Sequence, residues 1–441
     1  MNKLWKIVPV ILLMGVFRQG ISQVPGSKVH TACQFLEYFS SGRTVESYEL
    51  LDPSVRSKIS VEQMEQLWQS IEFQMGELES TGAVRTEIQE RYEFVYISCV
   101  FAHTSVDLRV VFPTLGELIT GFFFAPPATG ASYTRPSYAE ELDYTEINTA
   151  VVTDTFRLPA TLMLPPGKGP FPLVILVHGS GPADRNASLG PNRIFADLAY
   201  GLASKGIATL RYEKRTRVYG TALDVNSLTL YEETIQDAVS AIDSFREHPS
   251  VDPEEIYVLG HSLGAYAAPW IADLAGERLA GIILMAANAS PLEDLVLEQY
   301  RYLYALDGIS QMEKENLDVL EEQVQRVKRR KLDEDIPAVD LPLGLPAAYW
   351  LGMKKYDPVK KAKKLRIPVL ILQGERDYQV PLSEYEKWKK GLEKEKHITF
   401  RLFSGLNHLF LEGEGASEPA EYLIPGHVPL DVISFISDWI L

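Results

Sequence analysis

Residues 260–264, near the middle of the chain, have the sequence G-H-S-L-G and surround a serine that could act as a nucleophile. An apolar run, residues 255–259, precedes them, and a run of small residues follows. A strand, a G-x-S-x-G turn and a helix in this order form the context required of a nucleophile elbow. Glycine suits positions 260 and 264 because a side chain there would collide with neighbouring backbone. Ser262 is the candidate nucleophile, and the alternative is an ordinary glycine turn that carries a serine.

A serine nucleophile needs a histidine base and a carboxylate that orients the imidazole, and each is expected on a loop after a strand. The apolar run 367–373 is followed by G-E-R-D, and a later alternating strand is followed by a loop that contains His408. We expect Asp377 to be the acid and His408 to be the base. Glu375 is the alternative acid. His427 is the alternative base, although it lies in a proline-rich stretch.

A second glycine-rich segment, H-G-S-G-P at residues 178–182, follows the apolar strand 173–177. Together the four motifs resemble, in kind and order, those of bacterial serine esterases in the α/β-hydrolase superfamily, in its serine aminopeptidase-like branch. The resemblance covers about residues 140–441. It implies an α/β fold with a mostly parallel central sheet flanked by helices. The family places its acid after G-x-x-D, which favours Asp377 over Glu375.

The same resemblance implies where the oxyanion hole lies. In the family, the loop at residues 178–182 supplies one N–H donor, and the residue after the nucleophile, here Leu263, supplies the other. Ser180 is the expected donor on the loop, and Gly179 is the alternative. We expect His178 to brace this loop rather than to react.

Composition limits the classes of partner and cofactor. The net charge of −16 argues against nucleic acid or an anionic membrane surface as a partner. The chain has no H-E-x-x-H motif, phosphate-binding glycine loop or Cys/His cluster, so the sequence supports no metal or nucleotide cofactor. The two cysteines, Cys33 and Cys99, lack the spacing of a metal site; they form either a disulfide or two buried thiols. The expected partner is a small-molecule ester.

The start of the chain has the pattern of a secretory signal peptide at residues 1–22. Two lysines precede an apolar run of about 11 residues, 7–17, which is too short to span a bilayer. Small residues at Gly20 and Ser22 match a cleavage site. We therefore expect export to the periplasm or the medium, with an uncleaved anchor as the alternative.

At 441 residues the chain is too long for one compact core. Residues 28–125 are expected to form a small α+β domain. It resembles the cone-shaped domain of unknown function that precedes some bacterial hydrolases. Residues 126–137 contain several prolines and are expected to be a linker. The elements expected in the first domain are helices at 32–39 and from Ser60, and strands at 92–101, 106–112 and 118–124.

Residues 138–441 alternate strands and helices, as a mostly parallel sheet requires. The elements expected besides those above are strands at 158–164, 206–210 and 280–286 and a helix at 231–246. Residues about 291–365 break the alternation and show only helical spacing. In this superfamily such an insertion is a lid over the active site. Four aromatic residues are expected either to line an acyl pocket or to pack the lid: Tyr300, Tyr304, Tyr349 and Trp350.

These features predict an exported serine carboxylesterase that cleaves short- to medium-chain acyl esters through an acyl-enzyme. A serine aminopeptidase of the same fold is the main alternative. Such an enzyme needs an anionic subsite for the amino group of its substrate, and Glu293, Asp294 and Glu298 in the lid are candidates for it. A non-catalytic binding protein of this fold is a further alternative.

Overall fold

The computed structural model describes residues 27–57, 59–89, 92–101, 105–125, 133–139, 143–224, 226–306, 308–309 and 311–441. The chain divides into two compact units; the first extends to Ala131 and the second begins at Ser132. The predicted signal peptide and residues 126–132 of the predicted linker lie outside the described residues. None of the described helices is long and apolar enough to cross a membrane.

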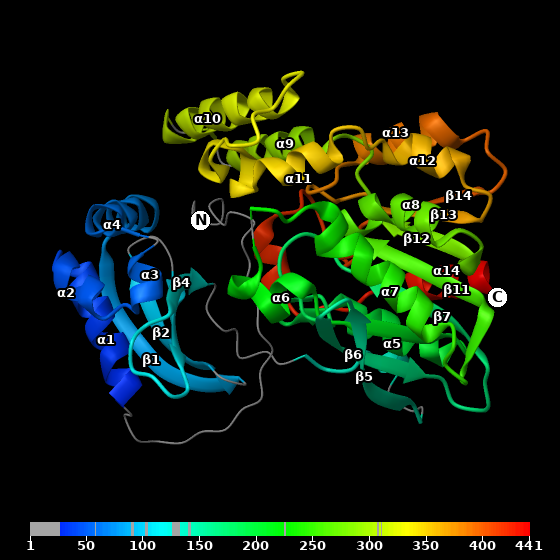
Figure 1. Cartoon of the computed structure of the whole chain (residues 1–441), viewed down its shortest axis with the longest axis horizontal. Helices are drawn as coiled ribbons and strands as arrows, with labels where there is room; N and C mark the ends of the chain where they lie inside the picture. The colour runs from blue at the N-terminus through cyan, green and yellow to red at the C-terminus, as the bar shows by residue number, and fades with distance from the viewer. Residues whose placement is uncertain are drawn as a thin grey trace. The chain divides into compact units, whose positions relative to one another are not determined.

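The first unit packs helices against an antiparallel sheet (Figure 1). Its helices are α1 (Ser27–Ser40), α2 (Thr44–Glu49), α3 (Pro53–Arg56) and α4 (Val61–Met75). Its strands, in sheet order, are β1 (Leu78–Gln89), β2 (Tyr92–Phe101), β3 (Ser105–Pro113) and β4 (Gly121–Ala125). Ser60 caps α4 and exchanges hydrogen bonds with Gln63, because each satisfies a backbone N–H that the first helical turn leaves free. The α+β architecture expected for this part of the chain is confirmed.

Strand β1 was not expected from the sequence. Its apolar residues Val84 and Ile88 are 41% and 67% exposed, so this strand at the sheet edge has no buried apolar face to produce a pattern. Pairing with β2 holds it instead. The strand expected at 118–124 begins three residues later, at Gly121.

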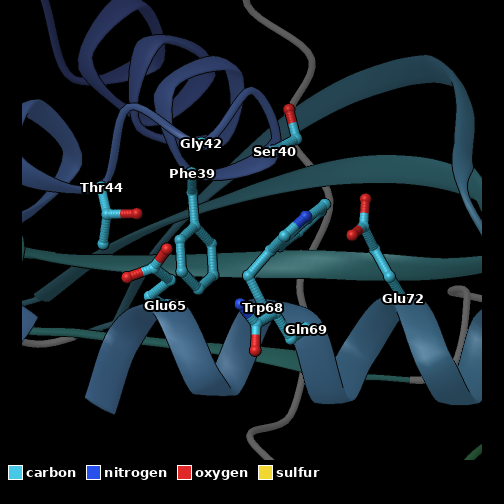
Figure 2. Close-up of a pocket in the computed structure, with 8 residues that line it drawn as sticks. All are labelled: Phe39, Ser40, Gly42, Thr44, Glu65, Trp68, Gln69 and Glu72. Atoms are coloured by element: carbon cyan, nitrogen blue, oxygen red, sulfur yellow. The ribbon is translucent and has the colours of Figure 1, made fainter. Parts of the chain in front are cut away.

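A hollow of about 200 Å³ lies between α4 and the segment that joins α1 to α2 (Figure 2). The indole of Trp68 meets the ring of Phe39 edge-on, with the ring centroids 5.0 Å apart. The residues lining the hollow are Phe39, Ser40, Gly42, Thr44, Glu65, Trp68, Gln69 and Glu72.

The two cysteines of the first unit are not bonded to each other. Cys33 on α1 is half-buried and Cys99 on β2 is buried, and both are free thiols. The structure therefore contains two thiols rather than the disulfide.

The second unit is built on an eight-stranded sheet. Its strands, in sheet order, are β14 (Ile398–Phe403), β13 (Val369–Gly374), β12 (Gly281–Met285), β11 (Val251–His261), β7 (Phe171–Val177), β10 (Ala208–Tyr212), β6 (Phe156–Leu164) and β5 (Thr145–Thr153). The strands from β14 to β10 are parallel, whereas β6 pairs antiparallel with both β10 and β5. The mostly parallel sheet expected from the alternating pattern is confirmed; strand β5 was not expected.

Helices cover both faces of this sheet (Figure 1). Alternate residues of β7 face opposite sides. Leu173 and Ile175 join the core under α7 (Gln236–Phe245) and α8 (Leu263–Ala275), and Val174 joins the core under α5 (Ile194–Ser204) and α14 (Leu430–Ile440). The remaining helices of the sheet layer and the short segments are α6 (Arg215–Tyr219), α13 (Leu382–Leu392), β8 (Ser188–Leu189), β9 (Asn192–Arg193), η1 (Ser137–Ala139), η2 (Gly220–Ala222), the π-helical η3 (Tyr231–Ile235), η4 (Gly276–Arg278) and η7 (Pro419–Leu423).

Between β12 and β13 the described residues form helices and turns, with no strand. The elements are α9 (Leu292–Ala305), α10 (Gln311–Lys328), η5 (Ala338–Asp340), η6 (Pro342–Gly344), α11 (Ala347–Met353) and α12 (Pro358–Lys364). Leu320 and Val324 of α10 pack against Val296 of α9, as the helical spacing predicts.

The four aromatic residues singled out in this insertion pack against their neighbours. Tyr349 and Trp350 are each only 1% exposed and belong to the main core of the unit. Tyr304 is buried between α9 and α10, where the half-buried Tyr300 meets its ring at 5.8 Å. The packing role therefore accounts for Tyr304, Tyr349 and Trp350.

Candidate active site

The candidate site lies at the carboxyl ends of the parallel strands of the eight-stranded sheet. Ser262 follows β11, Asp377 follows β13 and His408 lies beyond β14. The loop that begins at His178 follows β7, which pairs with β11 in the sheet. Because neighbouring parallel strands end at the same edge, their loops meet there, and this edge is where ligands bind in open α/β sheets.

Ser262 occupies a strained turn between β11 and α8. Its φ of +55° and ψ of −120° fall in a region that residues with a side chain rarely adopt. A Cβ added at Gly260 would lie 2.3 Å from the carbonyl oxygen of Gly264, and one added at Gly264 would lie 2.3 Å from that of Val177. The Ser262 N–H donates to the Met285 carbonyl at 2.9 Å, which ties the turn to β12. The turn therefore requires both glycines and presents the serine at the sheet edge.

Asp377 and His408 form a buried hydrogen-bonded pair. His408 Nδ1 lies 2.8 Å from Asp377 Oδ2, and the two residues are each 4% exposed. The other carboxylate oxygen, Oδ1, accepts from the backbone N–H groups of Gln379 and Val380, both at 2.9 Å. Since a carboxylate only accepts hydrogen bonds, Nδ1 of His408 carries the proton and Nε2 is left as the acceptor. This tautomer is the one that a general base needs.

The alternative acid and base have other partners. Glu375 accepts a hydrogen bond from the Ser404 hydroxyl at 2.7 Å. His427 Nδ1 lies 3.1 Å from the buried carboxylate of Asp197. The structure brings Asp377 rather than Glu375 to His408.

His261 connects the elbow to the loop that carries His408. Its Nε2 donates to the His408 carbonyl at 2.8 Å, and the two imidazole rings are 4.7 Å apart. Burial is the main cause that lowers the pKa of His261 to about 3, and the nearby His408 contributes less. The ring is therefore neutral at physiological pH. His261 therefore ties the loop that carries His408 to the elbow.

The loop after β7 passes directly beside the serine. A Cβ at Gly179 would lie 3.1 Å from the Ser262 Cβ and 3.6 Å from its Oγ. Gly181 adopts φ +81°, a conformation that favours glycine. His178 Nε2 donates to the Asp184 carbonyl at 2.9 Å, and burial lowers the pKa of its ring to about 3. The contact expected from His178 is present: its ring joins the start of the loop to the Asp184 carbonyl, six residues later.

The two residues expected to supply the N–H donors of the oxyanion hole lie on the elbow and on the loop beside it. Ser180 follows the glycine that lies against the serine, and Leu263 is the first residue of α8. The N–H groups in the first turn of a helix have no partner within the helix, so the Leu263 N–H is free to donate elsewhere. The structure places Gly179 beside the Ser262 side chain, and Ser180 and Leu263 stay the predicted oxyanion donors.

The charged segment after β10 is salt-bridged, and its lysine contacts the loop after β7. Arg215 pairs with Asp237 at 2.5 Å. Lys214 pairs with Glu233 at 2.6 Å and also donates to the Gly179 carbonyl at 2.7 Å. The sequence offers no signal for this contact, because a lysine within a charged loop has the pattern of a solvated residue. Among the residues that the structure describes, no cluster of His, Cys, Asp or Glu side chains is arranged to hold a metal ion.

The sheet order, the elbow after β11 and the acid and histidine on later loops define an α/β-hydrolase. Residues 170–415 match the family described as serine aminopeptidase, S33, which spans more than half of the chain. The chain belongs to this family. Residues 32–120 match a family described as a protein of unknown function, DUF3887.

Similar proteins include esterases. The chain is 36% identical over 407 residues to esterase EstD from Thermotoga maritima, which covers 92% of this chain and 94% of that protein. Among solved structures, Est1E from Butyrivibrio proteoclasticus covers 66% of this chain and 95% of its own, with 17% identity and a TM-score of 0.42. An esterase from Pyrobaculum calidifontis covers 68% and 85%, with 16% identity and a TM-score of 0.42.

Proposed function

We propose that this chain is a serine carboxylesterase that hydrolyses uncharged esters through an acyl-enzyme intermediate. The observation that carries the proposal is the buried Asp377–His408 pair, held by His261 beside the strained turn that presents Ser262. The near full-length similarity to a protein named as an esterase supports an ester as the substrate.

In the first half of the reaction, Ser262 Oγ attacks the carbonyl carbon of the ester while its proton passes to His408 Nε2. Asp377 stabilises the imidazolium that forms. The oxyanion accepts hydrogen bonds from the N–H groups of Ser180 and Leu263. When the tetrahedral intermediate collapses, the bond to the leaving oxygen breaks, and His408 returns the proton to the departing alcohol.

In the second half, water attacks the acyl group on Ser262, and His408 takes one proton from that water. A second tetrahedral intermediate forms and is stabilised by the same two N–H groups. It collapses with release of the carboxylic acid, and the proton held by His408 returns to Ser262 Oγ. The products are one alcohol and one acid, and the enzyme is restored.

Replacement of the nucleophile tests the proposal. Ser262→Ala should lower kcat on a soluble nitrophenyl ester by about 10⁴- to 10⁶-fold without loss of fold. Ser204→Ala, at the end of α5, is the matched control and should retain wild-type activity. A fluorophosphonate should label Ser262 in the wild-type protein, as identified by peptide mass. A Ser262→Ala protein that retains a tenth of the activity would contradict the assignment.

The serine aminopeptidase alternative remains because the matched family carries that description. Of the three lid acids, Glu298 is exposed, and the other two give little support as an anionic subsite. Asp294 is already paired with Lys328, and burial raises the pKa of Glu293, which disfavours its anionic form. Turnover of a leucyl anilide faster than that of every ester tested would favour the peptidase. A folded protein that turns over neither substrate would favour the non-catalytic alternative.

We further propose a preference for short to medium acyl chains, with the helical insertion after β12 acting as the lid. Each methylene buried in an acyl pocket contributes about 0.8 kcal/mol, so selectivity between neighbouring chain lengths should be shallow. The measurement is kcat/KM on acetyl, butyryl, octanoyl and palmitoyl nitrophenyl esters. A maximum at palmitoyl would contradict this preference.

Export is a separate proposal that rests on the sequence of residues 1–22. Expression of the full chain in a bacterial host, followed by fractionation and N-terminal sequencing, tests it. We expect the protein outside the cytoplasm with Gln23 as its first residue. Intact protein that starts at Met1 in the cytoplasm would contradict export.

A further inference from the structure

Lys214 is a buried cation directly behind the proposed oxyanion loop. It is only 2% exposed, and its ammonium group lies 2.7 Å from the Gly179 carbonyl oxygen and 2.6 Å from the carboxylate of Glu233. Glu233 is 6% exposed. Removal of two charges from water costs several kcal/mol per ion before their attraction is counted. A buried pair is thus weak evidence for stability, and its contact with a catalytic loop suggests another role.

The contact acts on one particular peptide group. The carbonyl of Gly179 and the N–H of Ser180 belong to the same planar unit, and in a trans peptide they point in opposite directions. Gly179 packs against the Ser262 side chain. A lysine that holds the carbonyl on one side of this peptide therefore sets the direction of the N–H on the other side.

The contact also changes the strength of the donor. A charge-assisted hydrogen bond to a carbonyl oxygen is stronger than a neutral one, and it polarises the peptide so that its N–H donates more strongly. Lys214 holds the same loop at a second point, because its own N–H donates to the Ala183 carbonyl at 3.1 Å. The lysine thus holds the loop at Gly179, within the H-G-S-G-P segment, and at Ala183, directly after it.

We propose that Lys214 is a positioning residue for ester hydrolysis, which orients and polarises the Gly179–Ser180 peptide so that the Ser180 N–H stabilises the oxyanion. This inference rests on the proposed function. Lys214 touches neither the substrate nor the reacting atoms and acts through the peptide that it binds.

Two further residues hold the lysine in place. Glu233, in η3, balances its charge and also accepts a hydrogen bond from the Tyr349 hydroxyl at 2.5 Å. Tyr349 lies in α11 of the insertion and is 1% exposed. Three buried side chains, Lys214, Glu233 and Tyr349, therefore connect the insertion to the oxyanion loop.

The test removes the charges in pairs, because the loss of one partner would leave an unpaired buried ion. The variant Lys214→Met/Glu233→Gln retains an acceptor for the Tyr349 hydroxyl. The matched control, Arg215→Met/Asp237→Asn, breaks the other buried ion pair of the same loop. Thermal unfolding of both variants measures the structural effect alone.

Two kinetic measurements separate positioning from stability. Loss of a whole oxyanion donor costs about 10²- to 10³-fold in kcat, so a weakened donor should cost about 10- to 100-fold. We expect this loss in kcat on nitrophenyl butyrate, with KM within about threefold of wild type. The Ki of a trifluoromethyl ketone, which forms a tetrahedral oxyanion adduct, should rise by the same factor as kcat/KM falls. In the control variant both quantities should stay within about threefold of wild type.

A folded Lys214→Met/Glu233→Gln protein with wild-type kcat and Ki would overturn the inference, as would an equal loss in the control variant. Should this double variant fail to fold, Lys214→Gln/Glu233→Gln decides, because it retains a neutral donor at position 214 and leaves no unpaired charge: a loss of kcat matched by a rise in Ki supports the inference, and wild-type values refute it. Lys214→Arg retains both charge and donor and should preserve kcat better than Lys214→Gln/Glu233→Gln. Fluorophosphonate labelling of the wild-type protein keeps the two hypotheses apart, because absence of label on Ser262 refutes the proposed function itself.

Discussion

Replacement of Asp377 by asparagine exchanges one hydrogen-bond acceptor of the side chain for a donor, with almost no change in its shape. In the native protein Oδ1 accepts from two backbone N–H groups, and Oδ2 accepts from His408 Nδ1 at 2.8 Å and from Gln373 Nε2 at 3.1 Å. An asparagine must keep its single oxygen at the two backbone donors. Its NH₂ group then faces His408 and Gln373.

This geometry sets the size of the effect. To accept from the NH₂ group, His408 must lose the proton on Nδ1 and carry it on Nε2, where it can no longer accept the proton of Ser262. We expect kcat to fall by about 10⁴-fold, the cost of the wrong tautomer in a serine triad. Gln373 loses one hydrogen bond but keeps another to the Val380 carbonyl at 2.8 Å, so the free energy of unfolding should fall by only about 1 kcal/mol.

The assay is hydrolysis of nitrophenyl butyrate at saturating substrate, together with urea unfolding of the same preparations. Glu375→Gln is the control, because this neighbouring acid accepts from Ser404 and should leave kcat within about threefold of wild type. If Asp377→Asn keeps a tenth of the wild-type kcat, or if Glu375→Gln is the inactive variant, the triad assignment is wrong.

Two further predictions concern the elbow and the buried histidines. Gly264→Ala should abolish activity and lower the melting temperature, because its Cβ would lie 2.3 Å from the Val177 carbonyl oxygen; Gly352→Ala in α11, with no contact under 3.4 Å, should be tolerated. The pKa of His178 is about 3 in the folded protein and about 6.5 in the unfolded chain, so the unfolded chain binds more protons between these values and stability falls as the pH drops through that window. His178→Gln should remove about 1.4 kcal/mol per pH unit from this slope in urea unfolding at a series of pH values, and an unchanged slope would show that His178 titrates normally.

The elbow could be predicted from the sequence because local backbone geometry constrains it. Gly260 and Gly264 flank Ser262 because the turn leaves no room for a Cβ at either position. A constraint of this kind acts over five consecutive residues and is visible as a motif. The buried strands β11 and β13 were predicted for a similar reason, because a strand covered on both faces is a continuous apolar run.

The residues that the sequence did not reveal depend on contacts between distant segments. Strand β5 is the last strand of the sheet and only Val151 and Thr153 in it are buried, so it lacks the apolar run that marks the central strands. Lys214 lies 35 residues from Gly179 in the chain, and the loop around it is rich in charge. Its burial depends on Glu233 and Tyr349, which the fold brings together from separate elements.

The site is held mainly by side chains that bind main-chain carbonyls. His178 binds the carbonyl of Asp184, His261 binds that of His408, and Lys214 binds that of Gly179. Each of these bonds fixes a loop that carries a proposed base or oxyanion donor, whereas the proposed nucleophile lies on a turn that its own backbone constrains. Because a main-chain carbonyl is present whatever residue occupies its position, the loops can vary in side chain and still be held. Changes at these three residues should therefore act on kcat through loop position rather than on substrate binding, which is the signature that distinguishes them from residues of the acyl pocket.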